Sequence, residues 1–192
     1  MKNERSWKIK RETAKKYDAL ADTYDALYGE EQGAKIKSAL ESIQIRKSDL
    51  VLDVGCGTGL LFRNIEDCVE FLVGLDISRR LLKKALCKSR DSPKIFLVRA
   101  DADYLPFADE VFDKVFTITV LQNMPDVNAT LHEIIRIAKR DAHFIVTGLK
   151  KSFAKEQFLR LLYKAGLEVL NIKTNGRLLG FVVVCRKKNK YK

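Results

Sequence analysis

The segment Val51-Leu52-Asp53-Val54-Gly55-Cys56-Gly57-Thr58-Gly59 decides the fold of this chain. Its first four residues form a mostly apolar run, which is typical of a buried parallel strand. Three alternating glycines follow, and glycine lets a backbone turn sharply and approach a ligand closely. A buried strand that ends in such a turn predicts a cofactor-binding loop.

Two classes of cofactor compete for this loop. A nicotinamide dinucleotide site has the spacing Gly-x-Gly-x-x-Gly and holds a pyrophosphate at a helix N-terminus. Here the third glycine, Gly59, comes one residue early, and Leu60 stands where a dinucleotide site has glycine. The carboxylate of Asp53 would repel a pyrophosphate and attract a cation. S-adenosylmethionine carries an ammonium and a sulfonium but no phosphate, so the charges favour it over NAD.

Short apolar runs alternate with helical patterns from residue 50 onward, and this alternation predicts a parallel sheet with right-handed crossovers. Asn175-Gly176 is a strong hairpin signal between the last two runs, and Gly166 ends the last helix. The strands are expected at 51–54, 71–75, 94–98, 115–120, 144–147, 167–172 and 178–185. The helices are expected around 81–86, 131–138 and 158–165, after an amphipathic leader at 11–43.

These elements predict one α/β domain that is Rossmann-like and doubly wound. Its mostly parallel sheet of seven strands ends in an antiparallel hairpin, with helices on both faces. Residues 1–45 are expected to form a helical leader that acts as a lid, residues 46–185 the core, and residues 186–192 a basic tail. A chain of 192 residues is long enough to bury a substantial core.

The composition excludes several classes of protein. With 46% hydrophobic and 32% charged residues the chain is an ordinary globular sequence. No window approaches the roughly 18 consecutive apolar residues that span a bilayer, so we expect no membrane insertion. Cys56, Cys68, Cys87 and Cys185 are widely separated, with no cysteine pair or histidine cluster of metal-binding spacing. We therefore expect no metal site and a reducing, cytoplasmic location.

The net charge of +11 is concentrated near the two ends of the sequence. Residues 1–16 contribute +5 and residues 186–192 another +5, which leaves +1 for residues 17–185. Basic ends can bind polyanions through counterion release. In other proteins they have no partner and simply keep the chain soluble. Contact with RNA or protein through these ends is one interpretation, and a solubilising role is the other.

The glycine loop resembles motif I of the class I S-adenosylmethionine-dependent methyltransferases, and the resemblance continues over residues 14–185. The run Leu105-Pro106-Phe107-Ala108-Asp109, followed by Phe112-Asp113, is similar to the subgroup of ubiquinone-biosynthesis and "type 11" methyltransferases. The leader segment 17–25 is similar to the N-terminal helix of that subgroup. The resemblance implies S-adenosylmethionine as the cofactor and methyl transfer by in-line displacement.

The resemblance also implies roles for individual residues. Asp76 would hold the ribose hydroxyls, as an acidic residue about 20 positions beyond the loop does in dinucleotide sites, while Ser78 is the better N-cap for the next helix. Asp101 would accept from the adenine amine, with Asp103 as the alternative, and Tyr24 would reach over the cofactor. The predicted cofactor residues are Asp53, Gly55, Cys56, Gly57, Gly59, Asp76, Ile77, Asp101, Ala102, Thr117 and Tyr24.

The segment 117–126 is similar to motif IV of the family, which lies beside the methyl group. Gln122 and Asn123 either contact the methyl acceptor or only satisfy backbone groups of the loop. The Asp/Asn-Pro-Pro-Tyr/Phe signature of enzymes that methylate nucleobase amines is absent. No general base stands out, which in-line displacement tolerates because positioning of the nucleophile supplies much of the rate.

Two features of the sequence bear on the size of the methyl acceptor. Lys139-Arg140-Asp141-Ala142 replaces the family's Pro-Gly-Gly turn before the fifth strand, and one helix with no inserted lid follows that strand. An open site and basic ends favour a macromolecular acceptor, either RNA or protein. The alternatives are a small-molecule acceptor, which the subgroup resemblance favours, and a non-catalytic cofactor-binding subunit.

Overall fold

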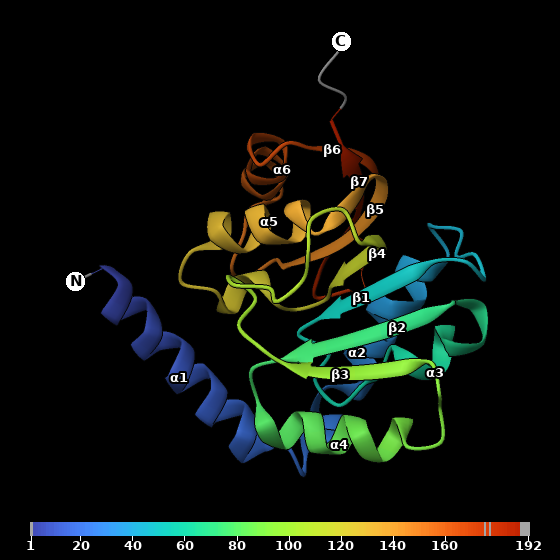
Figure 1. The fold of residues 1–192 in the computed structure, drawn as a ribbon. Coiled ribbons are helices and arrows are strands. Elements are labelled where there is room, and N and C mark those ends of the chain that lie inside the picture. Colours follow the sequence, from blue (N-terminus) through green and yellow to red (C-terminus); the bar gives the residue numbers. More distant parts are fainter. Residues whose placement is uncertain (1, 175, 177, 189–192) are drawn as a thin grey trace.

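The computed structural model describes residues 2–174, 176 and 178–188, and its centre is a sheet of seven strands in the order β3-β2-β1-β4-β5-β7-β6 (Figure 1). The five strands from β3 to β5 are parallel, and β7 is antiparallel to both of its neighbours. The fold confirms the predicted class, including the antiparallel pair at the end of the sheet. The strands are β1 (Leu50–Val54), β2 (Phe71–Asp76), β3 (Ile95–Arg99), β4 (Phe112–Thr117), β5 (Ala138–Leu149), β6 (Leu167–Lys173) and β7 (Gly180–Lys187).

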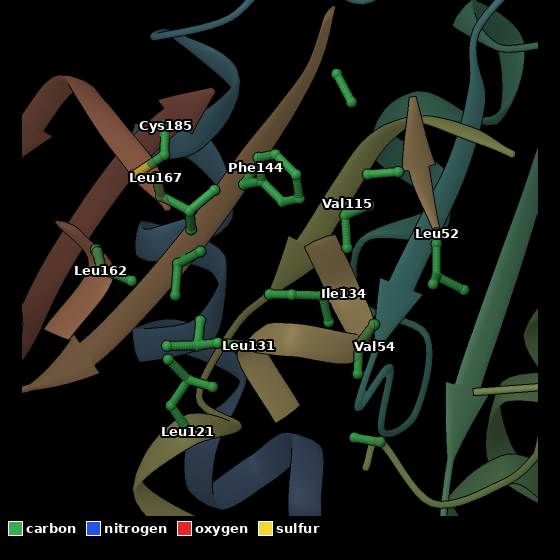
Figure 2. Close-up of a cluster of buried hydrophobic side chains, with 14 of the residues drawn as sticks. Leu52, Val54, Val115, Leu121, Leu131, Ile134, Phe144, Leu162, Leu167 and Cys185 are labelled. Atoms are coloured by element: carbon green, nitrogen blue, oxygen red, sulfur yellow. The ribbon is translucent and has the colours of Figure 1, made fainter. Parts of the chain in front are cut away.

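Helices cover both faces of the sheet, because alternate strand residues point to opposite sides. On one face α5 and α6 pack on Leu52, Val54 and Val115, as Figure 2 shows for part of this cluster. On the other face α2, α3 and α4 pack on Val51 and Phe116. The helices are α1 (Lys2–Leu20), α2 (Tyr24–Leu40), α3 (Phe62–Ile65), α4 (Arg79–Ser89), α5 (Val127–Arg136) and α6 (Lys155–Lys164), with 3-10 turns η1 (Glu66–Cys68) and η2 (Leu121–Asn123).

The helix α1 lies apart from these two layers, beyond the carboxyl ends of β1, β2 and β3, and it ends beside α4 (Figure 1). Its Asp18 accepts hydrogen bonds from the Ser78 hydroxyl at 2.6 Å and from the Arg80 amide at 2.9 Å. Ser78 is the N-cap of α4, as predicted, and accepts from the amide of Leu81 at 3.1 Å. The leader is therefore attached to the start of α4, next to the end of β2.

Two strands differ most from the prediction. The fourth strand covers Phe112–Thr117 in place of 115–120, and the fifth begins at Ala138 in place of 144. Ala138 was expected in the preceding helix, and residues 139–142 were expected in a turn. The charged residues at these strand ends have partners: Lys139 lies 2.8 Å from Asp113 of the neighbouring strand, and the exposed Arg140 lies 3.4 Å from Glu110, which precedes β4.

The basic ends of the chain are partly built into the fold. The N-terminal basic segment lies in α1. The strand β7 continues through Lys187, so the first two residues of the predicted tail pair in the sheet. Arg186 forms an ion pair with Glu168 at 2.8 Å, and the Lys187 ammonium donates to the carbonyl of Ala138. Asn175 of the predicted hairpin turn and residues 189–192 lie outside the described residues.

No helix within the described residues has the length and apolar character that crossing a membrane requires.

Candidate cofactor and acceptor site

The glycine loop leaves β1 with three glycines in the left-handed region, at φ values of 70° for Gly55, 57° for Gly57 and 76° for Gly59. Residues with a side chain rarely adopt this region. The amides of Gly55 and Cys56 both donate to the carbonyl of Leu75, at 2.7 and 3.0 Å. The loop is thereby held against the end of β2, as a strand-to-helix cofactor loop requires.

A cleft opens at this edge of the sheet. Ligands of open α/β sheets bind in such a crevice beyond the carboxyl ends of the strands. Its walls come from the glycine loop, from the segments after β2, β3 and β4, and from α1 and α2. The lining residues are Lys10, Thr13, Tyr17, Tyr24, Gly55, Gly57, Leu75, Asp76, Ile77, Leu81, Ala100, Asp101, Ala102, Ile118, Thr119, Val120, Asn123 and Met124.

The structure brings most of the predicted site residues together in this cleft. Those that line it are Tyr24, Gly55, Gly57, Asp76, Ile77, Asp101, Ala102 and Asn123. Five others do not: Asp53, Cys56, Gly59, Thr117 and Gln122. The Cys56 side chain packs in the apolar core, Gly59 lies against the Phe62 ring, and Thr117 is fully buried in β4. Gln122 lines a neighbouring cavity.

Asp76 joins the glycine loop to the start of α4. Its buried carboxylate accepts from the amide of Gly57 at 2.9 Å and from the amide of Ser78 at 2.8 Å. Burial raises the pKa of Asp76, although these backbone donors oppose the effect. Burial also raises the pKa of Asp53 to about 8, and the nearby charge of Asp76 adds to that shift. Two carboxyl groups that form no ion pair with any described residue therefore lie close to the loop.

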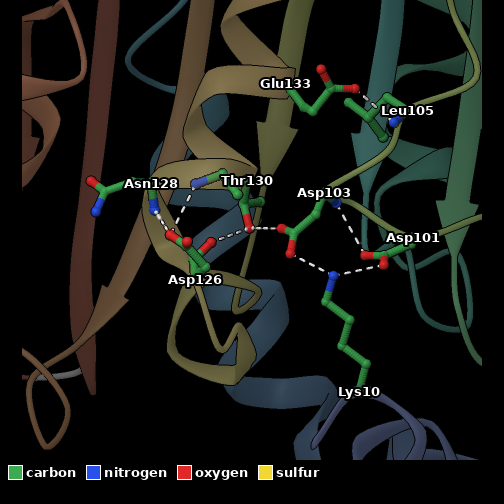
Figure 3. A network of polar contacts seen from close by, with 9 residues as sticks. Lys10, Asp101, Asp103, Leu105, Asp126, Asn128, Thr130 and Glu133 are labelled. Carbon is green, nitrogen blue, oxygen red and sulfur yellow. Dashed lines mark hydrogen bonds and ion pairs between the residues drawn. The ribbon is translucent and has the colours of Figure 1, made fainter. Parts of the chain in front are cut away.

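The choice between Asp101 and Asp103 follows from their surroundings (Figure 3). Asp103 faces α5 and accepts a 2.5 Å hydrogen bond from the Thr130 hydroxyl, whereas Asp101 lines the cleft. The Lys10 ammonium of α1 bridges the two, 2.6 Å from Asp101 and 2.5 Å from Asp103. Of the two carboxylates, Asp101 is thus the one that a ligand in the cleft can reach.

Lys10 is a site residue that sequence reasoning missed, since it is one of seven basic residues in the first sixteen. Its side chain is 5% exposed. Burial opposes its charge, but the hydrogen bonds to the two aspartates outweigh burial and raise its pKa. The rings of Trp7 and Tyr104 stack at 6.4 Å, and the ammonium lies 5.4 Å from each ring. This group docks α1 at the mouth of the cleft.

Replacing Lys10 with methionine should lower the free energy of unfolding by about 1–3 kcal/mol, because Asp103 then keeps a buried charge without its cation. Trp7 is the only tryptophan of the chain, so its fluorescence reports whether α1 stays docked. Urea titrations followed by this emission measure both effects. Lys8→Met, an exposed lysine of the same helix, is the matched control and should change stability by less than about 0.5 kcal/mol. Equal effects of the two substitutions would contradict the docking role.

A second cavity adjoins the cleft. Tyr17, Tyr24, Thr119 and Asn123 line both spaces. The tyrosine rings form a cluster with Tyr28, with ring centroids 6.1 Å apart for Tyr17 and Tyr24 and 5.2 Å apart for Tyr24 and Tyr28. The shared residues make this cavity the space that lies next to a ligand in the cleft.

Thr119 has a strained backbone at the boundary between the two spaces. Its φ of 64° is unusual for a β-branched residue, and such strain is often found at functional sites. The Thr119 hydroxyl accepts from the fully buried Lys35 at 2.7 Å and donates to Gln32 at 2.9 Å. Its amide donates to the Thr147 hydroxyl at 2.7 Å. These contacts from α2 and β5 hold the strained residue in place.

Gln122 and Asn123 differ in what their amides contact. The Asn123 side chain donates to the Tyr17 hydroxyl at 3.1 Å and to the Thr119 carbonyl at 3.0 Å, so it fixes the tyrosine at the boundary. Both amide atoms of Gln122 are buried and have no hydrogen-bond partner among the described residues. Unsatisfied buried polar groups are rare and costly. Asn123 thus has a structural task, and Gln122 is available for a ligand.

The residues of the cleft fit S-adenosylmethionine. They offer carboxylates for hydroxyl and amine donors, at Asp76 and Asp101, while their one cation, Lys10, is already paired with two aspartates. A pyrophosphate would find no free cation there. Among the described residues no three histidine, cysteine or acidic side chains are grouped as metal ligands.

Comparison with known proteins agrees with this assignment. The family described as "Methyltransferase domain" matches residues 52–146. The demethylmenaquinone methyltransferase of Mycolicibacterium vanbaalenii is 32% identical over 79% of this chain and 69% of its own. The uncharacterized protein MJ1252 of Methanocaldococcus jannaschii is 34% identical over 68% of this chain, which spans only 49% of that longer relative.

A chain of the complex between the Haloferax volcanii Trm112 methyltransferase activator and a methyltransferase has the same fold. The two superpose with a TM-score of 0.78 at 20% identity, over 90% of this chain and 98% of the other. The protein belongs to the family of S-adenosylmethionine-dependent methyltransferases, as the sequence motifs predicted.

Proposed function

We propose that the protein transfers the methyl group of S-adenosylmethionine to a small molecule bound in the second cavity. The observation that carries this proposal is the shared wall: four residues line both the cofactor cleft and the cavity. An acceptor in the cavity is therefore next to a cofactor in the cleft. Such juxtaposition is the main requirement for an in-line displacement.

The cofactor half of the site is assigned to the chain's own carboxylates. Asp76, which already orders the loop through Gly57, accepts from the ribose hydroxyls. Asp101 accepts from the adenine amine, and Asp53 beneath the loop attracts the cationic end of the ligand. Tyr24 covers the cleft from α2. S-adenosylmethionine supplies an electrophilic methyl group, and the protein's task is to orient the acceptor toward it.

Two observations favour a small acceptor over the RNA or protein expected from the sequence. The carboxyl edge of the sheet is partly covered, because α1 and α2 contribute Lys10, Tyr17 and Tyr24 to the walls of the cleft. Some residues of the basic segments that suggested a polyanion already have partners within the fold. Lys10 of α1 pairs with two aspartates, and Arg186 of β7 pairs with Glu168. The M. vanbaalenii relative is named for a small-molecule acceptor as well.

A non-catalytic cofactor-binding subunit is the other candidate. It would have no use for a second cavity with a buried, unpartnered amide at Gln122 and a strained residue, Thr119, held by three side chains. These features indicate that the space beyond the cofactor has a ligand of its own. We therefore favour a catalytic role.

The proposal is tested in two steps. Calorimetric titration with S-adenosylmethionine, S-adenosylhomocysteine and NAD should show binding of the first two alone. The protein is then incubated with cell extract and cofactor carrying a radiolabelled methyl group, and the product is dialysed. Label in the dialysable fraction is the expected result, and an Asp76→Ala variant should give none. Label that stays with RNA or protein would overturn the small-molecule acceptor, and binding of NAD alone would overturn the cofactor.

A further inference from the structure

We propose that the acceptor cavity selects an acidic aromatic compound. Its ring would lie among Tyr17, Tyr24 and Tyr28, and its carboxylate would face Lys150 and Lys151. The inference rests on the proposed function, because it names the substrate class of the same cavity. It follows from the charges, the rings and the one unpartnered amide of the lining.

The cavity has an excess of positive charge. Lys16, Lys150 and Lys151 line it, and none of the three forms an ion pair within the described part of the chain. The only acidic lining residue is Glu31. Its charge is balanced by the buried ammonium of Lys35, which lies 2.6 Å away. An anionic ligand therefore meets three uncompensated cations and no uncompensated carboxylate.

The lysines come from two parts of the chain. Lys150 follows β5, and its ammonium donates to the carbonyl of Leu178 at 2.8 Å, which fixes it beside the start of β7 without neutralising it. Lys151 is its neighbour in sequence. Lys16 of α1 lies over the Tyr17 ring, with its ammonium 5.8 Å from the ring centroid. A carboxylate between Lys150 and Lys151 is thus also within the field of a third cation.

The three tyrosines that line the cavity make it suitable for a flat ring. Aromatic rings pair in edge-to-face and offset geometries at centroid separations of about 4.5–7 Å, and the three tyrosines already do so. Burial raises the pKa of Tyr17 and of Tyr24, so their hydroxyls stay neutral and do not repel an anion. A ring in the cavity continues the cluster toward the cofactor cleft.

Gln122 adds a polar recognition element to the lining of the cavity. Its amide has a donor and an acceptor, both buried and both without a partner. A ring substituent such as a hydroxyl satisfies an amide in this position, because it can both donate and accept. The features together fit a hydroxylated aromatic acid better than an uncharged acceptor, because an uncharged acceptor offers the lysines no negative charge to pair with.

The test uses a matched pair of probes, 1-hydroxy-2-naphthoate and 1-naphthol, which differ only in the carboxylate. Binding to the full chain saturated with S-adenosylhomocysteine is measured by equilibrium dialysis at pH 7. We expect the acid to bind at least 10-fold more tightly, and its advantage to shrink as salt is added. Lys150→Met combined with Lys151→Met should remove the advantage, while Lys155→Met, an exposed lysine of α6 outside the cavity, should not.

The role of Gln122 is tested by Gln122→Met, which keeps the length of the side chain and should weaken both probes by a similar factor. Equal binding of the two probes, no effect of the double lysine substitution, or failure of both probes to bind would each overturn the inference. Calorimetry with S-adenosylhomocysteine on the same samples separates the two proposals. If the cofactor product binds and the probe preference is absent, only the substrate class is wrong; if it does not bind, the proposed function fails.

Discussion

Replacing Asp76 with alanine should weaken the binding of S-adenosylmethionine by about 100-fold or more. The carboxylate holds the amides of Gly57 and Ser78 and is proposed to accept from the two ribose hydroxyls. A hydrogen bond to a charged group contributes about 1.5–3 kcal/mol, so the loss of two amounts to about 3 kcal/mol or more. The amides left without an acceptor would also loosen the loop. Calorimetric titration of the purified variant measures the change.

Asp113→Ala is the matched control for this experiment. Asp113 also bridges two donors, since it accepts from the amide of Leu50 at 2.9 Å and from the Lys139 ammonium at 2.8 Å. It lies in β4 and does not line the cleft. Its removal should therefore lower the unfolding free energy but leave cofactor affinity within about twofold of the wild type. An Asp76→Ala protein that is folded and binds the cofactor normally would place Asp76 outside the site.

Most of the residues that the sequence identified lie at or just after the carboxyl ends of parallel strands. Gly55 and Gly57 follow a buried strand directly, and Asp76 ends the next strand, so the order of parallel strands brings them to one edge. The hairpin signal and the alternation of strands and helices are likewise local patterns. The family resemblance was confirmed for the same reason, since its motifs lie at these strand ends.

The residues that the sequence did not identify come from distant parts of the chain. Lys10 meets Asp101 across 91 positions, and Lys35 meets Thr119 across 84. A lysine in an amphipathic helix is expected to face water. No local pattern distinguishes Lys10 and Lys35, whose ammonium groups are buried against their partners, from the other lysines. The lid role of residues 1–45 was proposed from the subgroup resemblance, but the polar contacts that attach it depend on tertiary structure.

The misplaced strand ends have a related cause. Phe112–Lys114 and residues 139–142 carry several charges, which read as turn residues in isolation. In the fold they sit at the beginning of neighbouring strands, where Lys139 pairs with Asp113 and Lys114 lies 3.3 Å from Asp49. Pairing across strands removes the cost of each charge only when both partners are in place. A single-residue propensity cannot include that condition.

Binding of S-adenosylmethionine should release a proton from Asp53, so that affinity rises with pH between about 6 and 8. Without ligand the pKa of Asp53 is about 8, because the carboxyl is buried and lies near Asp76. A cation in the cleft favours the ionised carboxylate. Where a full proton is released, affinity changes about tenfold per pH unit, or about 100-fold over this range. Calorimetry in buffers of different ionisation enthalpy counts the protons released.

The same group contributes to the pH dependence of stability in the absence of cofactor. The folded protein holds the Asp53 proton up to about pH 8, whereas the unfolded chain loses it near pH 4. At Asp53 the folded state therefore binds more protons in this window, and this group should lower the free energy of unfolding as the pH rises from about 4 to 8. Asp76, whose pKa is also raised by burial, contributes with the same sign.

Asp53→Asn separates this effect from the titration of the ligand. The α-amino group of S-adenosylmethionine titrates near pH 8 as well, and its effect persists in the variant. The difference between the wild-type and variant profiles then belongs to Asp53: the variant should bind with a much flatter pH dependence and release fewer protons. Parallel profiles would show that Asp53 stays protonated in the complex, and would assign the charge preference of the site to Asp76 and Asp101 instead.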